Sequence, residues 1–206
     1  MVKVAFAFLI IFAPILCVFA QDRMPPIPAD KLTEMQEKAV EEFRSIRKAE
    51  LTGPFVPMLR SPEVMNRARA MGDYLRYRSA LPPRLSEFVI LMTARQWTQQ
   101  YEWSVHYPIA IDRGVAPDVA RAIADGRRPN QMRNEEEILY DFVMELQRNQ
   151  SVSDATYARA LSQFGEQGVI DTVGIVGYYT LLAMILNTTR TPPAESSAPV
   201  LAPFPR

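Results

Sequence analysis

The sequence predicts an all-α protein in which helices pack on one another around a single core. Apolar residues recur at helical spacing in several segments, proline and glycine separate these segments, and no alternating strand pattern lasts. The chain has 206 residues, of which 48% are hydrophobic, so it can fill the core of one domain. Its 23 basic and 23 acidic side chains cancel and form no long basic run, which argues against nucleic-acid binding.

Residues 1–20 predict a secretory signal peptide. Lys3 is the only charge before an apolar run from Val4 to Phe19, and small or apolar residues occupy the −3 and −1 positions of a cleavage site after Ala20. An uncleaved membrane anchor is the alternative, but the run is shorter than the ~20 residues that a spanning helix usually needs. We therefore expect a periplasmic or secreted protein that has no membrane contact after cleavage.

Cys17 is the only cysteine of the chain. Cleavage after Ala20 would leave a mature chain of 206 − 20 = 186 residues without any cysteine. Such a chain has neither a disulfide nor a catalytic thiol, so its core alone must stabilise it.

The N-terminal third predicts two long helices. A Pro-rich lead at 21–29, extended or disordered, precedes a helix from Ala29 to Leu51 that Asp30 can cap. Thr52-Gly53-Pro54 ends this helix, and the apolar segment 55–60 reads as a loop packed on the core. Ser61 and Pro62 have the residue types of an N-cap and first helical position, and the helix that they open should run to about Arg78.

The middle of the chain predicts a helix, a break and a second helix. The pattern is strongly helical from Arg84 to Trp97, turns polar around 98–101, and is apolar and helical again from Trp103 to Ala110. Pro108 suggests a kink or a short break there. A short helix from Ala116 to about Asp125 follows.

The last third of the chain predicts three helices and a loosely packed C-terminal tail. An amphipathic helix at 134–148 begins with Glu135, Glu136 and Glu137, which we expect to be a solvated first turn. A helix at 155–164, a turn at 165–168 and a helix at 169–186 follow, and the last of these is apolar all round and should be buried. The domain would end near 190, and a Pro-rich tail at 191–206 should be loose.

His106, the only histidine, is the centre of the candidate catalytic site. Glu102 precedes it by four residues, which on a helix puts both side chains on one face, where the carboxylate can orient the imidazole as a general base. Glu87 lies in an apolar run, where a carboxylate tends to a raised pKa. A continuous helix would separate Glu87 from His106, so their meeting requires the break near 98–101.

Each of these observations also has a plainer interpretation. Glu102 and His106 could form an exposed helix pair, and Glu87 could lie at a helix edge. The neighbouring aromatic residues could belong to the core, and no spacing typical of a zinc site supports a metal. Spacing alone therefore does not decide between an active site and a helix surface.

Two segments resemble the core motif of the carboxymuconolactone decarboxylase-like family, which belongs to the alkylhydroperoxidase D-like superfamily. They are Leu85-Ser86-Glu87-Phe88-Val89-Ile90-Leu91 and Tyr101-Glu102-Trp103-Ser104-Val105-His106, the latter carrying Glu-Trp-x-x-His. Further similar segments are 53–55, 81–85 and 173–179, so the resemblance covers roughly residues 30–190. It implies an alkylhydroperoxidase D-like helical bundle and a trimer-based homo-oligomer.

The resemblance also implies which chemistry to expect. In the peroxidase members a glutamate, a Cys-x-x-Cys and a histidine form a proton relay, and these positions correspond here to Glu87, to Gln99 and Glu102, and to His106. Glutamine and glutamate form no thiolate, so hydroperoxide reduction is not expected, although the superfamily includes peroxidases. The decarboxylase members act without a cofactor on a carboxylated lactone, with histidine and glutamate assisting proton transfer.

We therefore predict a cofactor-independent lyase for a small carboxylic acid or lactone, with His106, Glu102 and Glu87 as catalytic residues and no metal. Tyr101 and Trp103 would line the pocket, and Arg84 or Arg95 would hold a substrate carboxylate. The alternative is a non-catalytic helical module that binds a small molecule or a partner. A peroxiredoxin-type activity has the least support from the residues.

Overall fold

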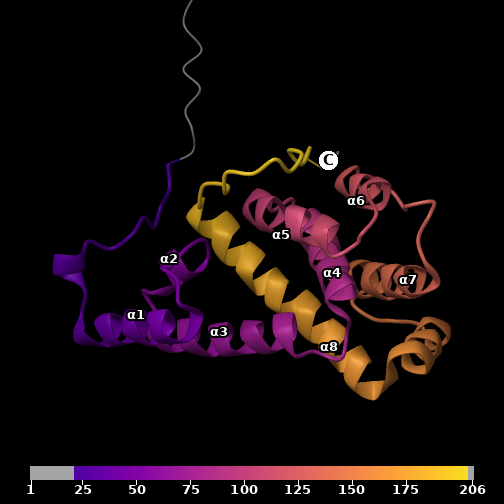
Figure 1. Cartoon of the computed structure of the whole chain (residues 1–206), viewed down its shortest axis with the longest axis horizontal. Coiled ribbons are helices and arrows are strands. Elements are labelled where there is room, and N and C mark those ends of the chain that lie inside the picture. Colours follow the sequence, from indigo (N-terminus) through magenta and orange to yellow (C-terminus); the bar gives the residue numbers. More distant parts are fainter. Residues whose placement is uncertain (1–20, 204–206) are drawn as a thin grey trace, which may run out of the picture.

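Helices alone make up the regular structure of residues 21–203, which are the part of the chain that the computed structural model describes (Figure 1). The predicted signal peptide lies outside these residues. The elements are a 3-10 helix η1 (Ala29–Lys31) and the α-helices α1 (Glu34–Arg47), α2 (Phe55–Met58), α3 (Pro62–Tyr77), α4 (Pro83–Gln96), α5 (Gln100–Asp112), α6 (Pro117–Ala124), α7 (Asn134–Asn149) and α8 (Asp154–Thr189). The prediction of an all-α bundle is confirmed.

Helices α4 and α8 form the centre of the bundle. Figure 1 shows α8 crossing the molecule diagonally, with α1 and α3 along one side and α4 to α7 on the other. Helix α4 packs on α5, α6, α7 and α8, and its residues from Leu85 to Arg95 are all buried. The strongly apolar run that predicted α4 is thus the middle of the core.

The first long helix is shorter than predicted. Leu32 has an extended conformation, so the chain forms only the three-residue η1 before α1 begins at Glu34. Thr33 caps α1: its hydroxyl accepts the Gln36 N–H while the Gln36 side chain accepts the Thr33 N–H. This reciprocal capping box satisfies two donors that Asp30 could not reach, and it fixes the start of the helix.

The predicted loop at 55–60 and the predicted break near Pro108 are not found. The segment 55–60 contains the short helix α2 in place of a loop, and its Phe55 and Met58 are buried. Helix α5 continues through Pro108 without a break, and Pro108 is exposed on its surface.

Helix α8 is interrupted and only partly buried. Its backbone leaves the helical conformation at Gly165 (φ 68°, ψ 176°) and resumes at once, so the predicted turn at 165–168 is a single residue. Ile170, Val173 and Met184 are 68%, 41% and 42% exposed, so the helix is not buried all round as predicted. By length and hydropathy α8 could cross a membrane, but 56% of its most apolar window is buried inside the bundle, as in the core helix of a globular protein.

The C-terminal end of the described chain is anchored. Leu201 is buried, and its N–H donates to Gln100 Oε1 at 2.8 Å on α5. The Arg95 guanidinium donates to the Ala202 carbonyl at 2.7 Å. The tail, which the sequence predicted to be loose, therefore packs against the bundle near α5 (Figure 1).

Candidate active site

The break between α4 and α5 brings Glu87 and His106 together. Trp97 ends α4, Thr98 has a positive φ of 45°, and the Gln99 side chain caps α5 by accepting the Tyr101 N–H at 2.6 Å. The chain reverses at this point, and α5 packs back along α4. Glu87 on α4 and His106 on α5 then face each other, although one continuous helix would have separated them.

Glu87 joins His106 to Arg113 in a buried charge cluster. Glu87 Oε2 lies 2.6 Å from His106 Nδ1, and Glu87 Oε1 accepts a hydrogen bond from Arg113 at 3.1 Å. The side chain of Glu87 is fully buried, and that of His106 is 5% exposed. A carboxylate that already accepts from Arg113 acts as an acceptor again, so Nδ1 carries the proton and Nε2 is left as the basic nitrogen.

His106 opens onto a cavity of about 160 Å³ that helices α2, α3, α5 and α8 and the end of α1 enclose. Burial lowers the pKa of His106, and the hydrogen bond that its Nδ1–H donates to Glu87 opposes this effect only in part. The imidazole is therefore neutral at neutral pH, as a general base requires. The residues lining the cavity are Arg47, Thr52, Pro54, Phe55, Arg76, Tyr101, Glu102, Val105, His106, Tyr178, Tyr179 and Leu182.

Glu102 faces the same cavity but does not orient His106. Both of its carboxyl oxygens are buried and have no hydrogen-bond partner within residues 21–203. Burial raises the pKa of Glu102 well above its usual value, which favours the protonated, neutral form of the carboxyl group. The spacing of four residues put Glu102 and His106 on one side of α5, but the carboxylate that binds the imidazole comes from α4.

Two tyrosines of α8 form another wall of the cavity. The Tyr179 ring meets the His106 ring edge to face, with 5.0 Å between centroids, and Tyr178 packs on Tyr179 at 5.2 Å. Burial raises the pKa of Tyr178 to about 12, and it also raises that of Tyr179 well above its ordinary value. Both phenols therefore stay protonated, and they exclude water from one side of the imidazole.

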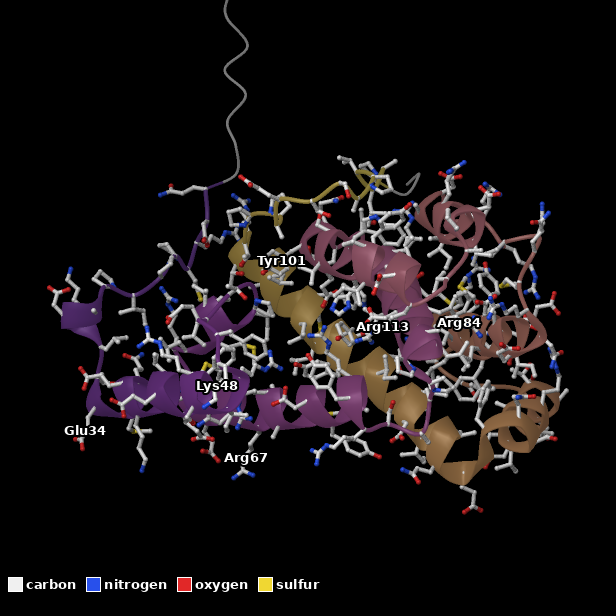
Figure 2. The ribbon with its side chains drawn as sticks, viewed as in Figure 1. Glu34, Lys48, Arg67, Arg84, Tyr101 and Arg113 are labelled. Carbon is white, nitrogen blue, oxygen red and sulfur yellow. The ribbon has the colours of Figure 1, made fainter. Side chains whose placement is uncertain are left out.

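Of the predicted binding residues, the structure places some at the cavity and others away from it. Tyr101 lines the cavity, whereas Trp103 is fully buried in the core and packs against Tyr107. Arg84 pairs with Glu135 and Glu136 at the start of α7, toward which its label lies in Figure 2, and Arg95 binds the tail. Neither arginine reaches the cavity.

The partner of Arg84 also changes the interpretation of α7. Glu136 is buried, although its turn was predicted to be solvated. One of its oxygens binds Arg84, and the other accepts the Arg133 N–H at 2.9 Å. The acidic first turn of α7 therefore docks this helix on α4, besides its favourable position at the helix N-terminus.

Several functional candidates were not found from the sequence. Arg113 follows His106 by seven residues, two helical turns on the same face, so its spacing could have identified it. Arg76 and Tyr179 come from α3 and α8, and no local pattern connects them to the histidine. Their presence in the site depends on how these helices pack.

No metal site or peroxidatic pair is found in the described chain. Among residues 21–203, no three side chains of His, Cys, Asp or Glu come together as metal ligands. Of the two positions that correspond to the peroxidase cysteines, Gln99 is a helix cap that also donates to Asn187 Oδ1 at 2.8 Å, and Glu102 faces the cavity. Neither residue is part of a redox pair.

Two solved structures with this architecture are described as uncharacterized peroxidase-related proteins. One is an alkylhydroperoxidase AhpD core protein from Ralstonia eutropha JMP134, with a TM-score of 0.69 and 18% identity over 84% of this chain and 92% of its own. Another, from Silicibacter sp. TM1040, has a TM-score of 0.69 and 15% identity over 87% of this chain and 95% of its own.

In a comparison of the sequence with known protein families, no family model matches the chain. No curated protein matches it either. At 15–18% identity the structural likeness establishes the architecture and not the reaction. The chain has the alkylhydroperoxidase D-like fold.

Proposed function

We propose that this protein is a cofactor-independent enzyme of the carboxymuconolactone decarboxylase type, which performs acid/base chemistry on a small carboxylic acid or lactone. The supporting observation is the neutral His106 at the wall of a cavity, with its Nδ1 bound to Glu87. A second, neutral carboxyl group, Glu102, faces the same cavity. A base and an acid at one site are the groups that such a reaction needs.

His106 Nε2 takes the role of the base. It accepts a C–H proton of the substrate and returns it to the product once CO2 has left, and in between the imidazole is a cation whose Nδ1–H points at Glu87. The Glu87 carboxylate stabilises this cation, and Arg113 holds the carboxylate in place through its other oxygen. Glu87 and Arg113 thus act on the substrate only through His106, as positioning residues.

Glu102 takes the role of the acid. In a decarboxylation the bond between the substrate carbon and its carboxylate breaks, CO2 leaves, and the electron pair stays on the substrate. A protonated carboxyl group can donate a hydrogen bond to the oxygen that gains charge, or transfer its proton to the carbon. The buried carboxyl group of Glu102 is suited to this step because no group within residues 21–203 forms a hydrogen bond with it.

A thiol peroxidase activity is not proposed for this chain. Peroxide reduction of that type needs a thiolate and a resolving partner, and residues 21–203 contain no cysteine. Cys17, the only cysteine of the whole chain, would offer a single thiol without a second one to resolve it.

The acid/base proposal is tested by NMR titration of the tag-free mature protein, in which one histidine gives one imidazole to follow. The pKa of His106 should lie below the ordinary ~6.5 and should fall further in Glu87→Gln, because the carboxylate raises it. Glu102→Gln is the matched control and should move it little, since Glu102 is neutral. An ordinary pKa that ignores Glu87→Gln contradicts the assigned base.

Turnover is tested by following CO2 release from a panel of carboxylated lactones and 3-oxo acids. His106→Ala should abolish release from any active compound while the far-ultraviolet circular dichroism stays unchanged. A compound that binds equally well to the wild type and to His106→Ala, and that neither converts, favours the alternative of a non-catalytic binding module.

We further propose export and self-association, which rest on the sequence. Mass spectrometry of the exported chain should give the 186 residues that remain after 206 − 20, with Gln21 first. A trimer-based homo-oligomer would cover the exposed apolar residues Ile170, Val173 and Met184 of α8. A monomer in sedimentation velocity at micromolar concentration contradicts that assembly.

A further inference from the structure

Arg76 is a cavity residue that has no carboxylate at ion-pair distance among residues 21–203, and Glu87 attracts it only from a longer range. It lies near the end of α3 and lines the cavity together with Glu102 and His106. Within residues 21–203 its guanidinium takes part in no ion pair or hydrogen bond, its Nε is buried and unpartnered, and its one ring contact is with Tyr77 at 5.2 Å. An unpaired charge beside a cavity is costly unless water or a ligand satisfies it.

The other charges around the cavity are already balanced. Arg47, the second guanidinium of the lining, pairs with Asp73 at 2.8 Å and lies over the Phe55 ring at 4.6 Å. Asp73 also binds Arg69, which in turn pairs with Glu42, so these two arginines face two carboxylates.

The catalytic cluster is balanced in the same way. Arg113 faces Glu87, and His106 carries no charge at neutral pH. Burial favours the neutral form of the Glu102 carboxyl group, and in that form it adds no negative charge. Arg76 therefore leaves the cavity with one uncompensated positive charge.

The rest of the cavity fits a small ligand with an apolar body. Phe55, Val105 and Leu182 contribute apolar surface, and Tyr178 and Tyr179 contribute ring surface. Glu102 adds a buried hydrogen-bonding group whose two oxygens have no partner in the described chain. It is more than nine-tenths buried, at 3% exposure, so it has been withdrawn from water without any protein group to replace the lost bonds.

We infer that the cavity binds a small monocarboxylate, with Arg76 as the residue that pairs with the carboxylate and the Glu102 carboxyl group as a second hydrogen-bond donor. A guanidinium matches a carboxylate with two parallel hydrogen bonds. One carboxylate neutralises the charge of Arg76, whereas a dianion would bring a second charge to a cavity whose other arginine, Arg47, is already paired with Asp73. This inference rests on the proposed function for the reaction that follows binding, but it makes a separate statement about the ligand.

Calorimetric titration of the wild-type protein with three probes tests whether the cavity prefers a ligand with one negative charge. Benzoate is a monoanion with an apolar body, benzamide is its neutral counterpart, and phthalate carries a second carboxylate. Benzoate should bind at least about tenfold more tightly than benzamide, and phthalate should bind more weakly than benzoate. Equal binding of benzoate and benzamide, or no binding of benzoate at millimolar concentration, overturns the inference.

Variants then test whether Arg76 is responsible. Arg76→Met should weaken benzoate binding at least about tenfold and leave benzamide binding unchanged, and Arg76→Lys should retain part of the preference because it keeps the charge. Arg67→Met is the matched control, since Arg67 lies on the same helix, is 80% exposed and points away from the bundle (Figure 2). A benzoate preference that survives in Arg76→Met contradicts the assignment of this residue.

The two proposals can fail separately. If the pKa of His106 proves ordinary, the base is wrong, but a preference for benzoate that depends on Arg76 would still establish the carboxylate site. If that preference is absent while His106 behaves as predicted, the base stands and the substrate class is wrong.

Discussion

Glu102→Gln should remove a pH-dependent loss of stability that the cavity imposes on the protein. The folded state raises the pKa of Glu102 by burial, whereas the unfolded chain has the usual value near 4.5. Above pH 4.5 the unfolded carboxyl group releases its proton and the folded one keeps it. Raising the pH therefore favours unfolding, until the pH passes the folded pKa.

The size of the effect follows from proton linkage. While one proton is bound in the folded state and absent in the unfolded state, the free energy of unfolding falls by about 1.4 kcal/mol for each pH unit. Glutamine has no such proton. The difference in unfolding free energy between Glu102→Gln and the wild type should therefore rise with this slope above pH 5, whatever constant cost the buried amide adds.

Urea unfolding between pH 4 and 7.5, followed by the fluorescence of the buried Trp103, measures this difference. Glu63→Gln is the matched control: Glu63 is exposed on α3, and its difference from the wild type should stay flat within a few tenths of a kcal/mol. A flat difference for Glu102→Gln would show that its carboxyl group ionises normally in the fold. The role of Glu102 as the proton donor would then be wrong.

Two further predictions concern packing. An added Cβ at Gly72 would lie 2.2 Å from the Tyr178 hydroxyl, so Gly72→Ala should lower the free energy of unfolding by about 1–3 kcal/mol and disturb the cavity wall. An added Cβ at Gly177 would meet nothing within 4 Å, so Gly177→Ala should raise the free energy of unfolding by up to about 1 kcal/mol. In the tail, Leu201→Ala should cost about 2 kcal/mol because Leu201 is buried, and Val200→Ala should change stability by less than about 0.5 kcal/mol because Val200 is 84% exposed. Urea unfolding checks all four variants. A stable Gly72→Ala protein, or a tolerated Leu201→Ala, would show that these contacts do not form as described.

Local sequence patterns predicted a helix correctly where one signal, such as a long apolar run or a serine cap followed by proline, is much stronger than any other. The apolar run of α4 and the Ser61-Pro62 start of α3 both appear at the predicted places. The start of α1 was misjudged because Asp30 and Thr33 are both acceptable caps, and only Thr33 has Gln36 three residues later to complete the capping box. That pattern is local and could have been recognised.

Other differences depend on distant parts of the chain and could not have been recognised in this way. The tail is Pro-rich and lacks any periodic pattern, yet Leu201 is buried because α5 offers it a surface and Gln100 offers its N–H an acceptor. Helix α8 reads as apolar all round, but one face of it meets no other helix of the described chain, so Ile170 and Val173 are exposed.

The same distinction between local and distant interactions applies to the candidate site. The sequence by itself determined that His106, Glu102 and Glu87 were the residues to consider, because few titratable groups lie in apolar helical segments and one break separates them. Only the tertiary structure decided that Glu87, and not Glu102, binds the imidazole, and that Arg76 joins the cavity while Arg84 does not. The physical reason is that spacing within one helix fixes a shared face, whereas the distance between two side chains on different helices is set by how those helices pack.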